Sequence, residues 1–232
     1  MAAKQTKMSK SDTNNNQQVL LNFASQCEVK NHLAKPPRLK YVFSLSCNLR
    51  AREFFRLVKT NQIDAVLDTR VSREYRGPYF SSNEDDFRYL CECNNVTYKV
   101  IESLSPTKEM RTVFANRFKD VKSAADRDPM AWTVFLQLYQ ANLIERKVIS
   151  NSPLNEILYG DFESLAIVCA CKHHDDCHRS YACGLLSTVL PGVKTRILYP
   201  GDEPSRSSPR RYRLADFPWA NLTANGPKRK MK

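Results

Sequence analysis

The chain has 232 residues, of which 42% are hydrophobic and 26% charged, and its formal net charge is +12. This length suits one medium-sized domain with tails, and the apolar fraction is large enough to form a core. With six glycines and twelve prolines, the composition excludes a fibrous or wholly low-complexity protein.

The positive charge is concentrated at the two ends of the chain. Residues 1–40 carry seven Lys/Arg against two Asp/Glu, and residues 201–232 carry eight against three. Residues 1–35 are polar and residues 201–232 are rich in proline, serine and arginine, so both are predicted to be mostly disordered tails. Basic tails attract polyanions, which favours nucleic acid as a partner, but solvated basic tails with no partner are equally common.

No segment is typical of secretion or membrane insertion. The first residues lack the apolar core of a signal peptide, and LAIVCAC is far shorter than the roughly 20 residues that cross a bilayer. We therefore expect a soluble intracellular protein with reduced cysteines and no membrane partner. The expected location is cytoplasmic, and the run PKRK near the C-terminus resembles a nuclear-import signal.

Between the tails, short apolar runs alternate with helical patterns. Strands are predicted at 40–46, 63–69, 96–102, 165–170 and 193–199. Helices are predicted at 49–61, 83–95, 107–122, 129–148, 153–159 and 177–190, with Ser81 or Ser82 as the cap of the second. This alternation predicts an α/β fold over residues 36–200: a single Rossmann-like three-layer domain with a mainly parallel sheet of about five strands.

Polar residues gather where these predicted strands end. In a parallel sheet, ligands bind beyond the carboxyl ends of the strands, so these side chains are expected to converge. The residues concerned are Ser46 and Asn48 after the first strand, Asp68, Arg70 and Arg73 after the second, and the run from Cys169 to Ser180 after the fourth.

The segment CHRS, Cys177 to Ser180, lies where a loop enters a helix. Free backbone N–H groups at that helix start, with Arg179 beside them, suit a phosphate or a carboxylate. The same position is expected to lower the pKa of the Cys177 thiol. In the alternative interpretation, Arg179 bridges Asp68 or Asp176 and only holds two loops together.

The longer stretch CACKHHDDCHRS contains three of the eight cysteines and three of the four histidines. Zinc is therefore an alternative, with Cys169, Cys171, Cys177 and His178 as weak candidate ligands. The usual CxxC spacing is absent, which favours the floor of a pocket over a zinc knuckle. Cys91 and Cys93, on a predicted helix, are expected to be packing residues.

Several well-known catalytic motifs are absent. The sequence has no GxSxG, GxGxxG or GxxxxGK motif, which argues against a nucleophile-elbow hydrolase, a dinucleotide-binding fold and a P-loop ATPase. A phosphatase-like cysteine followed by five residues and an arginine is also missing, because Cys177 stands where the arginine would be.

Two segments nevertheless resemble a known family. The run FSLSCNLRAREFFRLVKTNQIDAVLDTRVSREYRGPYFS and the later IVCACKHHDDCHRSYACGLL are similar to the domain of unknown function 488 family. The resemblance covers roughly residues 40–198 and implies a compact α/β domain with no assigned activity. The matching positions are Ser46, Asn48, Asp68, Arg70, Ser72, Arg73, Phe80, Cys169, Cys177, His178, Arg179 and Ser180.

This sequence departs from the family pattern at three places. Leu45 stands where the family usually has a histidine, Cys171 stands where an acidic residue is usual, and ESLSP replaces a Gly-Gly pair.

The leading prediction is a nucleotide- or nucleic-acid-directed enzyme that binds a phosphate-bearing ligand, small molecule or nucleic acid. The predicted catalytic residues are Asp68, Cys177 and His178, and the predicted ligand-binding residues are Ser46, Asn48, Arg70, Arg73, Arg179 and Ser180. Replacing Arg70 or Arg179 by alanine is expected to weaken phosphate binding and leave the fold intact. The alternatives are a non-catalytic phosphate- or nucleic-acid-binding module and a zinc-stabilised domain.

Overall fold

The computed structural model describes residues 38–74, 78–116, 129–149, 153–171, 174, 177–190 and 192–200. The predicted tails, residues 1–35 and 201–232, lie outside this part of the chain. Within the described residues, no helix has the length and apolar character needed to cross a membrane.

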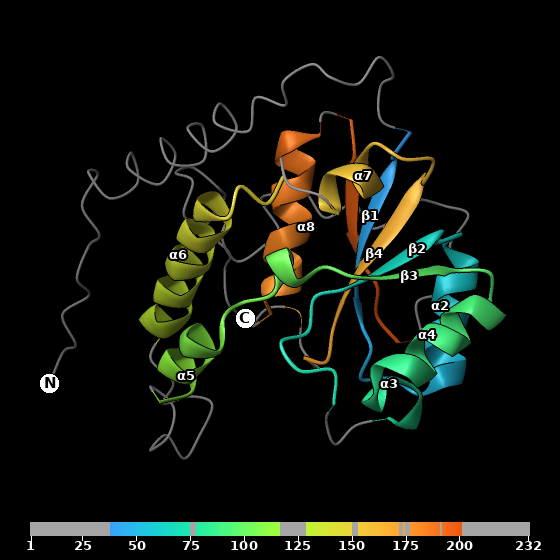
Figure 1. Cartoon of the computed structure of the whole chain (residues 1–232), viewed down its shortest axis with the longest axis horizontal. Coiled ribbons are helices and arrows are strands. Elements are labelled where there is room, and N and C mark those ends of the chain that lie inside the picture. Colours follow the sequence, from blue (N-terminus) through green and yellow to red (C-terminus); the bar gives the residue numbers. More distant parts are fainter. Residues whose placement is uncertain are drawn as a thin grey trace, which may run out of the picture.

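Strands and helices alternate along the described chain, as Figure 1 shows. In order they are β1 (Tyr41–Ser46), α2 (Ala51–Thr60), β2 (Ala65–Asp68), α3 (Tyr79–Ser82), α4 (Glu84–Cys93), β3 (Thr97–Val100), the 3-10 turn η1 (Glu102–Leu104), α5 (Lys108–Asn116), α6 (Pro129–Glu145), α7 (Leu154–Leu158), β4 (Ser164–Cys169), α8 (His178–Val189) and β5 (Lys194–Ile197).

The five strands form one parallel sheet in the order β3-β2-β4-β1-β5. All six residues of the central strand β4 are buried, which is expected of a parallel strand that helices cover on both faces. The predicted α/β fold with a mainly parallel five-stranded sheet is therefore confirmed.

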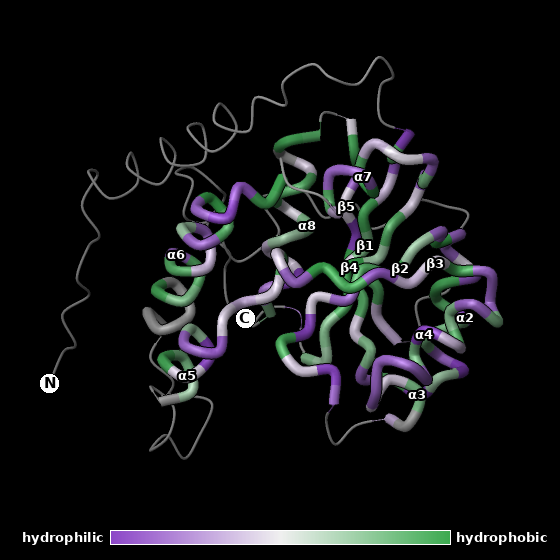
Figure 2. Tube along the Cα trace, viewed as in Figure 1, coloured by the Kyte–Doolittle hydropathy of each residue, from purple (hydrophilic) through white to green (hydrophobic). Residues whose placement is uncertain are grey.

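Alternation along the strands creates a separate hydrophobic core on each face of the sheet. Leu67 and Ile167 point to a core that includes residues of α6, α7 and α8. Val66 and Ala166 point to the other core, where Phe54 of α2 and residues of α4 pack. Figure 2 shows the apolar strands in the middle of this three-layer arrangement.

Three helices end with the same hydrogen-bonded motif. Gln62, Asn95 and Lys147 have positive φ angles of 50°, 57° and 49° after α2, α4 and α6. In each case the next residue, buried Ile63, Val96 or Val148, donates its N–H to a carbonyl five residues earlier. This pattern is the Schellman motif with its apolar contact, which stops each helix and turns the chain back into the core.

Two helix boundaries differ from the sequence predictions. Asn83, not Ser81 or Ser82, caps α4, because its side chain accepts a hydrogen bond from the Asp86 N–H at 2.7 Å. The two serines instead belong to the short helix α3. The helix predicted at 129–148 ends at Glu145, because the left-handed conformation of Lys147 terminates it. The helix predicted at 107–122 is described as α5 up to Asn116.

The two neighbouring strands β2 and β4 send the chain to opposite faces of the sheet. The helix α4, which follows β2, packs in one core, whereas α8, which follows β4, packs in the other. Such a divergence opens a crevice beyond the carboxyl ends of the two strands, and ligands of open α/β folds bind there. A functional site is therefore expected at this edge of the sheet.

Candidate functional site

A cavity of about 420 Å³ lies at the carboxyl ends of β2 and β4. Arg70, Val71 and Ser72 reach it from the loop after β2, and Cys169, Ala170 and Cys171 from the end of β4. The remaining lining residues come from the start of α8 and from the helices that cover this edge: Pro106, Arg111, Phe114, Ala115, Phe135 and His178. The cavity thus combines a cationic rim, an aromatic wall and a floor that contains sulfur.

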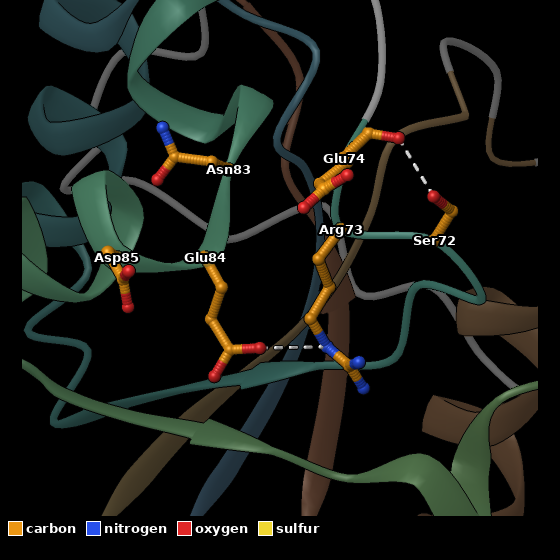
Figure 3. Close-up of a pocket in the computed structure, with 6 residues that line it drawn as sticks. All are labelled: Ser72, Arg73, Glu74, Asn83, Glu84 and Asp85. Atoms are coloured by element: carbon orange, nitrogen blue, oxygen red, sulfur yellow. Dashed lines mark hydrogen bonds and ion pairs between the residues drawn. The ribbon is translucent and has the colours of Figure 1, made fainter.

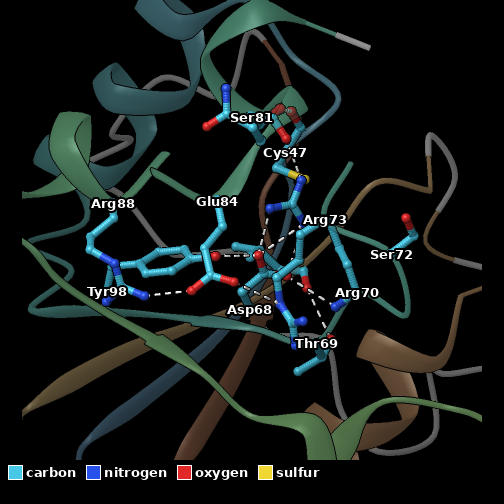
Figure 4. A network of polar contacts seen from close by, with 12 residues as sticks. Cys47, Asp68, Thr69, Arg70, Ser72, Arg73, Ser81, Glu84, Arg88 and Tyr98 are labelled. Carbon is cyan, nitrogen blue, oxygen red and sulfur yellow. Dashed lines mark hydrogen bonds and ion pairs between the residues drawn. The ribbon is translucent and has the colours of Figure 1, made fainter. Parts of the chain in front are cut away.

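Beneath the cavity, the buried carboxylate of Asp68 is fully occupied by neighbours (Figure 4). Arg70 donates to it from Nε at 2.9 Å and from Nη2 at 2.6 Å, and the Tyr98 hydroxyl donates to it at 2.5 Å. Arg70 also donates to the Ser81 carbonyl and lies over the Phe87 ring at 5.3 Å. Burial and the negative charge of Asp68 both raise the pKa of Tyr98, so its hydroxyl stays protonated as a donor. The cluster joins β2, β3, α3 and α4.

Arg179 is buried and faces backbone and sulfur atoms. Its Nη1 donates to the Cys171 carbonyl at 2.8 Å and to Cys177 Sγ at 3.1 Å, and its Nε donates to Ser44 Oγ at 3.2 Å. Ser46 Oγ donates to the same Cys171 carbonyl at 2.9 Å. Among the described residues, no carboxylate lies within ion-pair distance of this guanidinium.

His178 is fixed in one tautomer by Thr69. The Thr69 hydroxyl donates to the Val168 carbonyl at 2.9 Å, so both Thr69 oxygens near the ring can only accept. His178 Nε2 lies 3.0 Å from the Thr69 carbonyl oxygen and therefore carries the proton. Nδ1 is then the acceptor of a long hydrogen bond from the Cys177 thiol, with 4.0 Å between Nδ1 and Sγ. Burial lowers the pKa of His178, which keeps the imidazole neutral.

Three cysteines lie close together beside the cavity, and two of them, Cys169 and Cys171, line it. The sulfur atoms of Cys169, Cys171 and Cys177 all lie within 4.8 Å of one another, and Cys169 Sγ is 3.6 Å from Cys171 Sγ. Hydrogen bonds from the other two thiols lower the pKa of Cys171, the exposed member. Burial raises the pKa of Cys177 well above its ordinary value, so the predicted lowering at Cys177 is wrong.

Arg73 lies in a different hollow, which Figure 3 shows. This hollow, of about 370 Å³, is lined by Ser72, Arg73, Glu74, Asn83, Glu84 and Asp85. Arg73 Nε is 3.4 Å from Glu84 Oε2, and its Nη2 is 3.4 Å from Glu102 Oε1. Three carboxylates against one guanidinium make the hollow unfavourable for a phosphate.

A family model described as "Domain of unknown function DUF488" matches residues 50–186, which is more than half of the chain. The chain belongs to the DUF488 family. The match spans the Asp68–Arg70 cluster, the three cysteines, His178 and Arg179, and it confirms the resemblance seen in the sequence. Neither the curated proteins nor the solved structures contain a match to this chain.

The DUF488 domain brings only part of the predicted site to the cavity. Arg70, Cys169, Cys171 and His178 line it, whereas Cys177, Arg179 and Ser180 are buried behind its floor. Ser46 supports the Cys171 carbonyl, and exposed Asn48 donates its backbone N–H to Ser46 Oγ. The prediction that Arg73 shares a pocket with Arg179 is wrong, because its ion pairs draw it into the other hollow.

Further predictions of residue roles are settled by contacts within the DUF488 domain. Arg179 does not bridge Asp68, because Arg70 occupies that carboxylate, and Asp176 lies outside the described residues. Cys91 is a buried packing residue as predicted, but Cys93 is exposed, because it faces outward at the end of α4.

Three residues that line the cavity were not predicted from the sequence: Arg111, Phe114 and Phe135. They lie on α5 and α6, and their aromatic rings approach each other to 5.2 Å between centroids. Helical spacing alone gives these positions no special role, and only the packing of α5 against α6 brings them to the cavity.

Proposed function

We propose that this DUF488 domain binds a phosphate-bearing aromatic ligand of the nucleotide class in the cavity at the ends of β2 and β4. The observation that carries the proposal is the pairing of Arg111 with Phe114 and Phe135 around one cavity. A guanidinium suits a phosphate, and aromatic rings suit the face of a base.

The charge balance supports Arg111 as the phosphate-binding group. Arg70 also lines the cavity, but its charge is neutralised by Asp68 at 2.6 Å. Arg111 is exposed, and among the described residues no carboxylate forms an ion pair with it. An incoming phosphate therefore meets one positive charge at the rim that no described carboxylate compensates.

The size and lining of the cavity support a small organic ligand. A volume of about 420 Å³ lies within the usual range of roughly 300–1,000 Å³ for small-molecule sites. Phe135 is buried and Phe114 partly buried, so the aromatic wall is held by α5 and α6 before any ligand arrives. A wall that needs no rearrangement reduces the entropy lost on binding.

A nucleic acid carries the same phosphate and base groups as a nucleotide and is therefore a second possible ligand of this class. The basic segments 1–40 and 201–232 would attract a polyanion, and the cavity would accept one of its nucleotides. A free nucleotide and a nucleic acid differ in how strongly binding depends on salt, because only the polyanion releases many counterions.

The contacts of the three predicted catalytic residues support ligand binding better than they support a catalytic role for these residues. Asp68, Cys177 and His178 are 0%, 1% and 5% exposed, and their polar atoms already have protein partners. A general base must reach the proton that it removes, and these contacts leave no free acceptor on Asp68. A nucleotide-directed enzyme that uses these residues stays a prediction, which turnover of a nucleotide or oligonucleotide by the full chain would support.

Calorimetric titration of the full chain with AMP, ADP and inorganic phosphate tests the proposal. Arg111→Ala is expected to weaken nucleotide binding about tenfold to a hundredfold, the usual effect of losing a hydrogen bond to a charged group. Arg52→Ala, which removes the same charge from an exposed position on α2, is the matched control and should bind as the wild type does.

Phe114→Ala separates a nucleotide site from a simple anion site. It should weaken AMP and leave inorganic phosphate unchanged, because only AMP carries a base. Equal affinity for AMP in the wild type and in Arg111→Ala would exclude this cavity as the nucleotide site.

A further inference from the structure

We propose that Cys169, Cys171 and Cys177 bind a thiophilic divalent metal ion of the zinc class at the cavity floor. This inference concerns a second ligand of the cavity and does not depend on nucleotide binding. It rests on the positions of the three sulfur atoms, on the charge of Arg179 and on the direction in which the site is open.

The sulfur positions match one face of a tetrahedral thiolate site. Two thiolates bound to the same zinc ion at about 2.3 Å lie about 3.8 Å apart. Cys169 Sγ and Cys171 Sγ are 3.6 Å apart, and Cys177 Sγ lies within 4.8 Å of both. Only small side-chain rotations are needed to place all three sulfurs around one ion.

Sequence spacing concealed this arrangement. Cys169 ends β4, Cys171 lies two residues further, and Cys177 directly precedes α8. The Cys177 N–H donates to the His174 carbonyl at 3.2 Å, and Arg179 of α8 donates to the Cys171 carbonyl at 2.8 Å. These contacts hold the start of α8 against the end of β4 and bring together sulfurs that a CxxC pattern would not have predicted.

Arg179 supplies the charge that such a site needs. Three thiolates around a divalent ion leave one net negative charge, which is costly in a buried place unless a cation balances it. The buried Arg179 guanidinium donates to Cys177 Sγ at 3.1 Å. With the metal bound, the arginine and the metal–thiolate group neutralise each other, and Arg179 gains the anionic partner that no described carboxylate provides.

The fourth coordination position faces the cavity. Cys169 and Cys171 both line the cavity, whereas Cys177 lies behind them. The His178 ring is fixed through Nε2 and has its Nδ1 lone pair 4.0 Å from Cys177 Sγ, but it does not reach all three sulfurs. The fourth ligand is therefore a water molecule or a group of the cavity's ligand, as in zinc sites with three protein ligands. Thiolate donors select zinc or cobalt over magnesium and calcium.

Cobalt titration of the full chain, reduced and kept anaerobic, tests this inference without any nucleotide. We expect a sulfur-to-cobalt charge-transfer band that saturates at one equivalent and is displaced by zinc. Cys171→Ser changes an exposed side chain and should preserve the fold, yet weaken cobalt binding about tenfold or more. Cys93→Ser, at an exposed cysteine outside the cluster, is the matched control and should leave the band unchanged.

Two outcomes would overturn the metal site. One is a wild-type titration with no charge-transfer band, or with a band that Cys171→Ser does not weaken. The other is a Cys169–Cys171 disulfide in the protein purified without reductant, seen as the loss of two hydrogens by mass spectrometry, together with no metal binding after reduction. Circular dichroism of each variant separates loss of the ligand from loss of the fold.

Discussion

The Arg70 guanidinium lies 2.6 Å from the Asp68 carboxylate, and both side chains are buried. The pair stands at the end of β2, directly below the candidate cavity, and the Tyr98 hydroxyl completes it from β3. A buried ion pair held by several hydrogen bonds fixes the loop that forms the cavity rim. The Asp68–Arg70 pair therefore fixes the shape of the candidate cavity.

The first prediction concerns the cost of breaking this pair. Asp68→Ala leaves the Arg70 charge buried without its carboxylate, which should lower the free energy of unfolding by about 3–5 kcal/mol. Asp161→Ala breaks the exposed pair of Arg38 and Asp161 and should cost no more than about 1 kcal/mol. Urea denaturation of both variants checks this, and similar losses in the two would contradict it.

A second prediction concerns Tyr98, whose hydroxyl donates to Asp68 at 2.5 Å. Tyr98→Phe removes this hydrogen bond to a charged group and should lower the free energy of unfolding by about 1.5–3 kcal/mol. Tyr89→Phe is the control, because Tyr89 is exposed on α4. An unchanged urea midpoint for Tyr98→Phe would mean that water replaces the hydroxyl.

Arg179→Ala should destabilise the domain, contrary to the sequence-based expectation of an intact fold. The variant removes the charged donor of two hydrogen bonds, one to the Cys171 carbonyl and one to Ser44 Oγ, and a hydrogen bond from a charged group contributes about 1.5–3 kcal/mol. Urea denaturation should show a clear loss for Arg179→Ala and almost none for Arg52→Ala. Equal midpoints would mean that Arg179 is not integrated into the core.

The Schellman motifs give a prediction of the opposite sign. Lys147 holds a left-handed conformation that costs a non-glycine residue roughly 1–2 kcal/mol. Glycine removes this cost, but about half of the gain is lost because glycine has more conformational freedom in the unfolded chain. Lys147→Gly should therefore stabilise the domain by about 0.5–1 kcal/mol. Asn95→Gly should gain less, since asparagine tolerates this conformation better. Thermal unfolding measures both, and a loss of stability in Lys147→Gly would refute the argument.

The sheet could be predicted from the sequence because its strands are short apolar runs, and β2 and β4 are buried throughout. The segment around Ala166 and Ile167 is apolar at every position, as expected for a central parallel strand with a core on each face. The left-handed residues that end the helices were harder to foresee, because Gln62 and Lys147 lack the usual preference for this conformation.

The site could be predicted only in part, because side-chain direction and long-range packing decide it. Proximity in sequence grouped Arg73 with Arg70, but Glu84 and Glu102 hold Arg73 in the other hollow. Arg111 reaches the cavity because α5 packs beside α6, a contact that no local pattern records. The cysteine cluster depends likewise on contacts between the end of β4 and the start of α8, which spacing rules do not describe.

Photolabelling of the full chain with 8-azido-AMP, followed by peptide mapping, locates the nucleotide site directly. We expect labels that unmodified AMP competes away, on peptides that carry Phe114 or Phe135, the aromatic wall of the cavity. Arg111→Ala should reduce this labelling, and Arg52→Ala should not. Competed labels confined to residues 1–37 or 201–232 would contradict the account and assign nucleotide binding to the basic ends of the chain.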